Sequence, residues 1–158
     1  GPSPELHPLE AWFRPLFDLA DRNAQLAKAA GIARRLLAEQ QSVCVLHGDL
    51  HHENVLDFGA RGWLAIDPQP VFGDRAYDAA NLFYNPLDHT ALCLSEARIA
   101  AMAAVMARAL GIGPRHILDR AFTYGCLSAV WHAGDGNRED EARELSIAQA
   151  VRAVSLRL

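Results

Sequence analysis

Apolar residues along most of the chain recur with the 3.6-residue period of an α-helix. Pro15 lies inside the first such stretch, so we expect that helix to be kinked or split. Gly111, Gly113 and residues 134–137 separate the later stretches, as glycine-rich breaks do. The pattern predicts helices over residues 9–20, 26–37, 76–83, 99–110, 114–129 and 147–158.

Strand patterns are confined to one section of the chain. Val43–Leu46 is an apolar run typical of a short buried strand. Residues 54–58 and 63–67 flank a glycine-rich turn at 59–62, as the two arms of a hairpin do. Residues 68–73 are expected to form a loop because of their prolines and glycine. These strands are too few for a doubly wound sheet, so we predict a mainly α fold with a small β-hairpin region.

Composition and charge limit the partners of this domain. The 158 residues include 15 basic and 19 acidic side chains, a formal net charge of −4 with no basic run. A nucleic-acid partner is therefore not expected. No apolar stretch approaches the roughly 20 residues of a membrane span, so we expect no membrane partner either.

The three cysteines indicate the cellular compartment, and the first residues affect the bounds of the domain. Cys44, Cys93 and Cys126 each lie among apolar residues, and they predict reduced, buried thiols in a cytoplasmic protein. The opening residues 1–3 read as the remnant of a cleaved tag, so the domain is assigned to residues 4–158.

Three polar residues at strand edges form the chemical centre of the sequence. Asp49 lies in the loop after the first strand, Asn54 begins the hairpin and Asp67 ends it. Phosphoryl transfer needs a base for the attacking hydroxyl and metal ions on the phosphates. Mg²⁺ prefers oxygen ligands and takes one or two carboxylates. The sequence thus predicts Asp49 as the catalytic base and Asn54 and Asp67 as the Mg²⁺ ligands on the ATP side.

The motif His47-Gly48-Asp49-x-x-x-x-Asn54, followed by a hairpin and Ile66-Asp67, resembles the catalytic and metal motifs of the aminoglycoside phosphotransferases. Residues 46–86 and 6–17 look closer still to the streptomycin 6-phosphotransferase-like, or aminoglycoside/hydroxyurea resistance, branch. This resemblance implies a protein-kinase-like fold. It also implies transfer of the γ-phosphoryl group of ATP to a hydroxyl of a small molecule, a streptomycin-like aminoglycoside, in antibiotic resistance.

The sequence departs from the full kinase pattern. No Gly-x-Gly-x-x-Gly precedes residue 47, and the only lysine, Lys28, lies on a predicted helix rather than a strand. We therefore expect a C-terminal lobe without its N-terminal lobe, inactive by itself. Its catalytic loop and metal site would span residues 46–67, and a helical substrate-side region residues 74–158. Apolar surface near the hairpin would be exposed, so the chain is expected to self-associate.

Two neighbouring aspartates and one histidine are expected to serve the structure. Asp74 and Asp78 lie four residues apart on one helix face, Asp74 as the N-cap and Asp78 as a brace for the catalytic loop. The resemblance gives His47 a structural place, bonded to backbone near that loop.

An acidic cluster near the last helix has two possible interpretations, and the sequence does not decide between them. Asp135, Glu139 and Asp140 could bind a guanidinium group of the substrate, as acidic residues do in similar kinases. Alternatively they are the acids that favour the first turn of a helix, with Asn137 as its N-cap.

Two other functions compete with the kinase hypothesis. One is a non-catalytic scaffold or binding module built on a kinase lobe. The other is a zinc site at His47, His51 and His52, but His51 and His52 are adjacent, and adjacent residues in an extended segment point in opposite directions. The sequence also lacks the helical His-Glu-x-x-His spacing, which argues against zinc.

Overall fold

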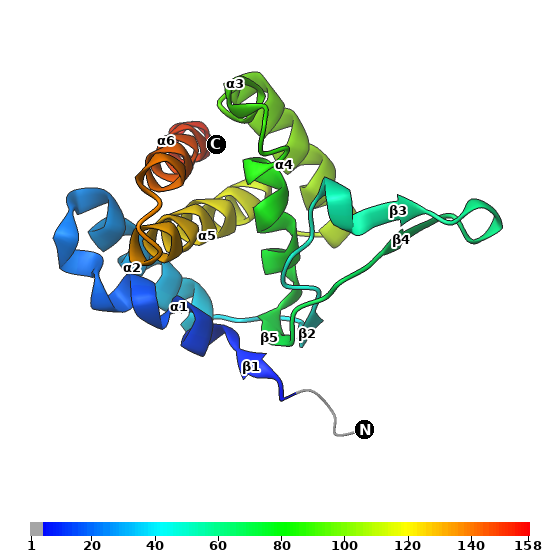
Figure 1. Cartoon of the computed structure of the whole chain (residues 1–158), viewed down its shortest axis with the longest axis horizontal. Helices are drawn as coiled ribbons and strands as arrows, with labels where there is room; N and C mark the ends of the chain where they lie inside the picture. Colours follow the sequence, from blue (N-terminus) through cyan, green and yellow to red (C-terminus); the bar gives the residue numbers. More distant parts are fainter. Residues whose placement is uncertain (1–4) are drawn as a thin grey trace.

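The computed structural model describes residues 5–158 and has a helical body with a small β part at one side (Figure 1). Helix α5 (Pro114–Gly134) crosses the middle of the body. Its residues between Ile117 and Val130 are buried on nearly every side, as expected for a helix that is apolar all round. The predicted tag remnant lies outside the described residues.

The other helices pack around α5 and confirm the helical prediction. They are α1 (Leu9–Asp18), η1 (Ala20–Arg22), α2 (Ala24–Ala38), η4 (Arg75–Tyr84), α3 (Thr90–Cys93), α4 (Glu96–Leu110) and α6 (Arg138–Ser155). Asn23, Ser95 and Asn137 cap the first turns of α2, α4 and α6 with their side chains. Gly111 ends α4 in the left-handed region, where glycine carries no steric cost.

Two details of the helical prediction need correction. Of the two alternatives at Pro15, a kink or a split, the split is wrong, because the first helix runs unbroken through this residue. Residues 75–84 form a 3₁₀-helix, not an α-helix. The last helix begins at Arg138 with Asn137 as its N-cap, as one interpretation of the acidic cluster predicted, and its first turns precede the apolar period that starts at residue 147.

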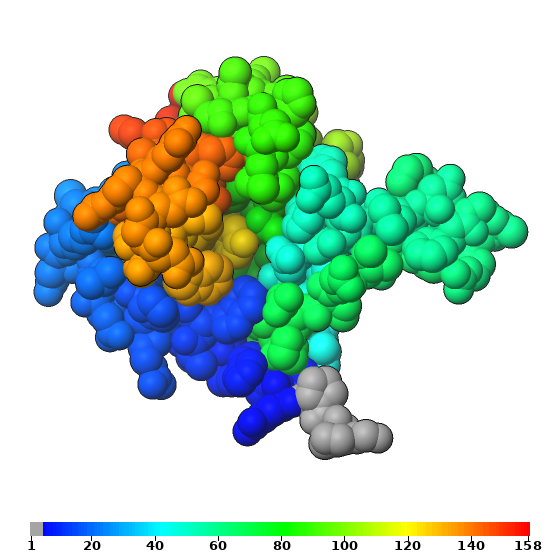
Figure 2. Space-filling view, viewed as in Figure 1, coloured from blue at the N-terminus to red at the C-terminus, as the bar shows by residue number. Residues whose placement is uncertain are grey.

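The β part consists of a three-stranded sheet and a separate hairpin. The sheet order is β1 (His7–Pro8), β5 (Val71–Asp74), β2 (Val43–Leu46), with β2 antiparallel and β1 parallel to β5. The hairpin pairs β3 (Val55–Asp57) with β4 (Trp63–Ala65), as predicted. It projects away from the helical body (Figures 1 and 2).

The expected loop at residues 68–73 is wrong at its end, where β5 begins. Val71 pairs with Leu46, and both side chains are buried against the body. Gly73 lies so close to Leu9 that a Cβ would collide with it. A four-residue strand that contains a glycine has no period to detect, so the sequence did not reveal it.

Burial of β2 was also mispredicted. Leu46 is buried, but Val43, Cys44 and Val45 are exposed, so Cys44 is not a buried thiol. Cys93 and Cys126 are buried, as expected. Val43, Val45 and Phe72 leave an apolar face of the sheet in solvent, which no element of residues 5–158 covers.

None of the described helices is by itself long and apolar enough to cross a membrane. Helices α4 and α5 would meet these criteria only together, and they are bent by 113° at the break between them.

Candidate active site

The loop between β2 and β3 holds Asp49 in a fixed but accessible position. Asn81 Nδ2 donates to Asp49 Oδ1 at 3.2 Å, and Asn54 Nδ2 approaches Oδ2 at 3.4 Å. A stronger bond of 2.9 Å runs from Asn54 Nδ2 to the Asp49 backbone carbonyl. The side chain of Asp49 nevertheless remains 40 % exposed. The carboxylate is therefore oriented by amide groups and open to a ligand.

The backbone of this loop rests on a carboxylate from η4. Asp78 accepts hydrogen bonds from the backbone N–H groups of His47 and Gly48, both at 2.8 Å. His47 Nε2 lies 2.7 Å from the carbonyl oxygen of Ile66, which ties the loop to the end of β4. Gly48 has a φ of +75°, and a Cβ there would press on Gln69 and Val71 at 3.0 Å.

Asn54 and Asp67 both lie at the base of the hairpin. The backbone N–H of Ile66 donates to the carbonyl oxygen of Asn54 at 2.9 Å, and Asp67 is the next residue after Ile66. Among residues 5–158, no group donates a hydrogen bond to Asn54 Oδ1. Asp67 is exposed with a φ of +56°, a rare conformation for a non-glycine residue and one that clusters at functional sites.

This donor set fits Mg²⁺ better than zinc. One carboxylate and one amide oxygen leave most positions of an octahedral ion to phosphate and water, as Mg²⁺ prefers. Zinc instead takes three or four His, Cys or carboxylate ligands. Over residues 5–158 no three such side chains gather.

Sequence reasoning did not identify Asn81 as a site residue. It lies three residues after Asp78, and side chains at i and i+3 of a 3₁₀-helix eclipse each other. Asp78 therefore supports the loop backbone while Asn81 reaches the Asp49 carboxylate from the same face of η4. The sequence feature that could have identified Asn81 is the Asp-x-x-Asn spacing, but this spacing is informative only once the 3₁₀ geometry is known.

An acidic cavity of about 650 Å³ opens between α3 and α6. It brings together Glu139 and Asp140, two of the three predicted substrate residues. Asp135 lies instead at a different hollow, beside Pro15 and Asp18. Asp88, Glu144, His132 and Arg143 also line the acidic cavity.

Glu144 is the most unusual group in this cavity. It is only 5 % exposed, and burial raises its pKa to about 7, although Arg143 and Ser128 oppose the shift. Ser128 donates to Glu144 Oε1 at 3.1 Å, and His132 Nε2 lies 3.9 Å from the same oxygen. Burial, then the charges of Glu144 and Asp49, raise the pKa of the Tyr124 hydroxyl.

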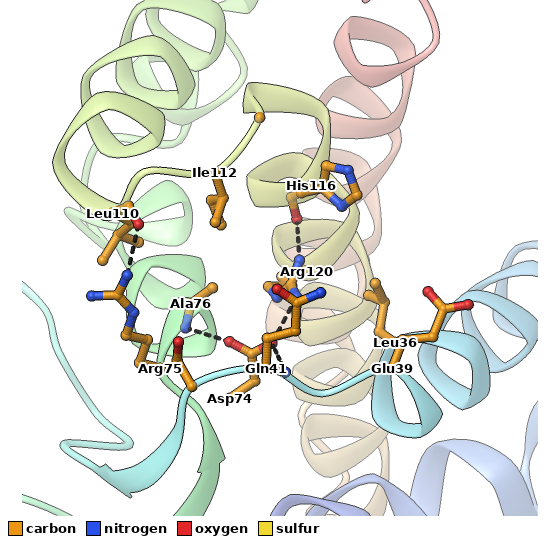
Figure 3. A pocket seen from close by; sticks show the side chains of 12 residues that line it. Leu36, Glu39, Gln41, Asp74, Arg75, Ala76, Leu110, Ile112, His116 and Arg120 are labelled. Carbon is orange, nitrogen blue, oxygen red and sulfur yellow. Dashed lines mark hydrogen bonds and ion pairs between the residues drawn. The ribbon is translucent and has the colours of Figure 1, made fainter.

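A second cavity, of about 260 Å³, lies beside Asp74 and Arg120 (Figure 3). Asp74 caps η4 through the N–H of Ala76 and pairs with Arg120 at 2.8 Å. Burial works to raise the pKa of Asp74, but these bonds outweigh burial and lower it. The ion pair joins the start of η4 to α5 and makes no contact with Asp49.

Comparison with known proteins decides the family. The family model for aminoglycoside/hydroxyurea antibiotic resistance kinases matches residues 1–136. The chain belongs to this family. The matched region includes the Asp49 loop, the hairpin and η4, but it ends before Glu139, Asp140 and Glu144.

Relatives of this kinase family are similar over most of the chain. It is 48 % identical to streptomycin 3''-kinase of Klebsiella pneumoniae, with 100 % of this chain and 60 % of the relative covered. It is 32 % identical to streptomycin 6-kinase of Streptomyces glaucescens, over 87 % of this chain and 44 % of that protein. Hydroxyurea phosphotransferase of Kitasatospora aureofaciens is 26 % identical over 86 % of the chain. No solved structure gives a significant match.

Proposed function

We propose that the chain is the C-terminal lobe of an ATP- and Mg²⁺-dependent streptomycin phosphotransferase with a protein-kinase-like fold. The observation that carries this proposal is the Asp49 carboxylate, oriented by Asn54 and Asn81 yet 40 % exposed. A catalytic base must be held in place and still reach the hydroxyl that it deprotonates. Family membership supplies the class of reaction.

Each residue of the loop then has a defined task. Asp49 accepts the proton of the substrate hydroxyl while that oxygen bonds to the γ-phosphorus and the bond to the ADP oxygen breaks. Asn54 Oδ1 and the Asp67 carboxylate would hold Mg²⁺, which neutralises charge on the phosphates when bound. Asp78 and His47 keep the loop backbone in place.

The acidic cavity is proposed as the site for the cationic part of the substrate. Asp88, Glu139, Asp140 and Glu144 face a single guanidinium, that of Arg143. Arg143 pairs with Glu144 at 3.3 Å, so the other three carboxylates leave the cavity with excess negative charge. Carboxylates pair well with guanidinium groups, which form bidentate hydrogen bonds. We include Asp135 only as an outer contact, because it lines another hollow.

The position of phosphorylation is proposed as the 3'' hydroxyl. The streptomycin 3''-kinase relative matches the whole chain, including α6 and the acidic cavity, at 48 % identity. The 6-kinase of Streptomyces glaucescens matches less of the chain at lower identity. Mass spectrometry and NMR of the product would separate the two positions.

The complete protein is the material for testing this function. This chain spans 60 % of the length of the streptomycin 3''-kinase, and its sequence holds no phosphate-covering glycine loop or strand lysine. We therefore expect the isolated chain to be inactive. ATP chemistry would place the enzyme in the cytoplasm.

The deciding experiment replaces the base. In the complete protein, Asp49→Asn should lower the turnover of streptomycin by about a hundredfold to ten-thousandfold, since an amide cannot accept the proton. The melting temperature should not change. Asp21→Asn, an exposed aspartate in η1, is the matched control and should leave turnover unaffected.

Unchanged turnover in Asp49→Asn would refute the role of this residue. A titration with Mg²⁺ and ATP addresses the alternative that the protein is a non-catalytic scaffold. Absence of nucleotide binding and of turnover in the complete protein would support that alternative.

A further inference from the structure

His51 is an ionisable side chain that the structure places against Asp49 and that has no task in the proposed reaction. Its Nε2 lies 3.7 Å from Asp49 Oδ2, and its side chain is 19 % exposed. It belongs to the same loop, two residues after the base. The inference below rests on the proposed function and adds a residue to it.

The hydrogen bonds of the loop determine which ring nitrogen of His51 carries the proton. The backbone N–H of Glu53 points at His51 Nδ1 from 3.3 Å. Nδ1 must therefore be an acceptor, so the proton of the neutral ring lies on Nε2. His47 follows the same rule, because Asp49 N–H donates to its Nδ1 and its Nε2 faces the Ile66 carbonyl oxygen. In both rings Nδ1 accepts and Nε2 donates.

The Asp49 carboxylate has an opening for this donor. Asn81 holds Oδ1 at 3.2 Å, but within residues 5–158 the only hydrogen-bond donor to Oδ2 is Asn54, at 3.4 Å. The Asn54 amide is bonded mainly to the Asp49 carbonyl oxygen, at 2.9 Å. A separation of 3.7 Å between Nε2 and Oδ2 is too long for a hydrogen bond. Such contacts at active sites are often long without substrate and shorten in the complex.

We propose that His51, as the neutral Nε2–H tautomer, is a positioning residue that holds Asp49 Oδ2 during phosphoryl transfer. With Asn81 on Oδ1 and His51 on Oδ2, the carboxylate cannot rotate, and its exposed lone pairs stay aimed at the substrate hydroxyl. The ring acts as an N–H donor without a change of protonation. A base displaced by about 1 Å loses on the order of a hundredfold in rate.

A structural role for His51 is the competing explanation, and two substitutions separate the two. The ring has one task at each nitrogen: Nδ1 accepts from Glu53 N–H, and Nε2 faces Asp49. In His51→Asn the amide oxygen takes the place of Nδ1 and preserves the turn, as Asn does in such turns. In His51→Gln the longer side chain puts its NH₂ group near the place of Nε2.

The experiment measures kcat and KM for ATP and streptomycin in the complete protein. We expect kcat of His51→Asn to fall about tenfold to a hundredfold, with both KM values nearly unchanged. His51→Gln should stay within about threefold of the unchanged protein, because it keeps a donor near Asp49. His52→Ala is the control, since His52 is the exposed neighbour and no hydrogen bond of its ring is involved.

Each outcome bears on the inference. Full kcat in His51→Asn, or a kcat in His51→Gln no higher than that of His51→Asn, would overturn the positioning role and leave the kinase function standing. No turnover in the unchanged protein would overturn the proposed function and this role of His51 with it. The predicted order, with Gln well above Asn, would support both.

Discussion

Glu144 is a carboxyl group that the fold keeps almost out of water at the wall of an acidic cavity. Isolated acids are seldom buried unless they are paired, because burial disfavours the charged form. Its partners are the Ser128 hydroxyl, the Arg143 guanidinium and the more distant His132 ring. A carboxyl with a pKa of about 7 can gain or lose its proton near neutral pH. Its charge state should therefore govern how well a cation binds in the cavity.

The affinity for a cationic substrate is predicted to rise with pH. Below pH 7 Glu144 is mostly neutral, and above pH 7 it is mostly charged. The charged carboxylate favours a guanidinium, so KM for streptomycin should fall severalfold between pH 6 and 8. Glu144→Gln in the complete protein should raise KM at pH 8 and flatten this dependence. The same slope in Glu144→Gln and in the unchanged protein would contradict the assignment.

From the sequence, site residues could be predicted only where they form a motif with a defined spacing. Asp49, Asn54 and Asp67 were predicted as a set from their positions at strand edges, and the structure brings them to one end of the hairpin. Their roles stay predictions. Glu144 was missed because it resembles the other acids of α6, and only burial sets it apart. Burial depends on α3 and α5, which no local pattern around residue 144 reveals.

Helix α5 and η4 approach each other closely at Gly125, which has no side chain. A Cβ on Gly125 would collide with the Tyr84 ring and hydroxyl. Tyr84 cannot easily move, because it is buried and its hydroxyl donates to the Ala121 carbonyl oxygen at 2.7 Å. The same 3₁₀-helix carries Asp78 and Asn81, which bond the backbone of Gly48 and the carboxylate of Asp49.

Gly125→Ala is therefore predicted to destabilise the protein by about 1 to 3 kcal/mol, the usual cost of an overpacked core. Gly134→Ala is the control in the same helix, since a Cβ there meets nothing within 4 Å. It should be neutral or stabilise by up to about 1 kcal/mol, as Ala favours helix over Gly. Urea unfolding would measure both. Equal stability of the two variants would show that the Gly125 contact is unimportant.

At the level of elements, the long helices could be predicted and the short connecting pieces could not. Helices α2, α4 and α5 have an apolar period and clear end signals, such as Pro114 and Gly111. Strand β5 has four residues and depends on β1 and β2 for its hydrogen bonds. The 3₁₀ form of η4 could not be predicted either, because the spacing of its alanines fits an α-helix as well.

Across the whole molecule, apolar surface is concentrated on the β part. Val43, Val45 and Phe72 share the exposed face of the sheet, and Leu56, Trp63 and Leu64 are exposed on the hairpin. Strand β2 is also an edge of its sheet, with unpaired backbone groups. Exposed apolar patches of this kind mark interaction surfaces or cause association. In the proposed enzyme, the part of the protein beyond this chain would cover them.

The isolated chain is predicted to self-associate through this face. Light scattering over a dilution series should show an average mass that rises with concentration. Val45→Lys places a charge on the edge strand and should shift the chain towards the monomer, because a lysine there opposes strand pairing. Val105→Lys on α4 is a matched control, since Val105 is 57 % exposed and Val45 60 %. That variant should associate like the unchanged chain.

The same measurement on the complete protein provides the comparison with the isolated chain. If its remaining part covers β2 and the hairpin, the complete protein should stay monomeric at concentrations where the isolated chain associates. Val45→Lys should then destabilise the complete protein, because it would bury a charge at an interface between lobes. A strictly monomeric isolated chain at high concentration would contradict the association. An unaffected stability of Val45→Lys in the complete protein would instead mean that the rest of the protein does not cover this face.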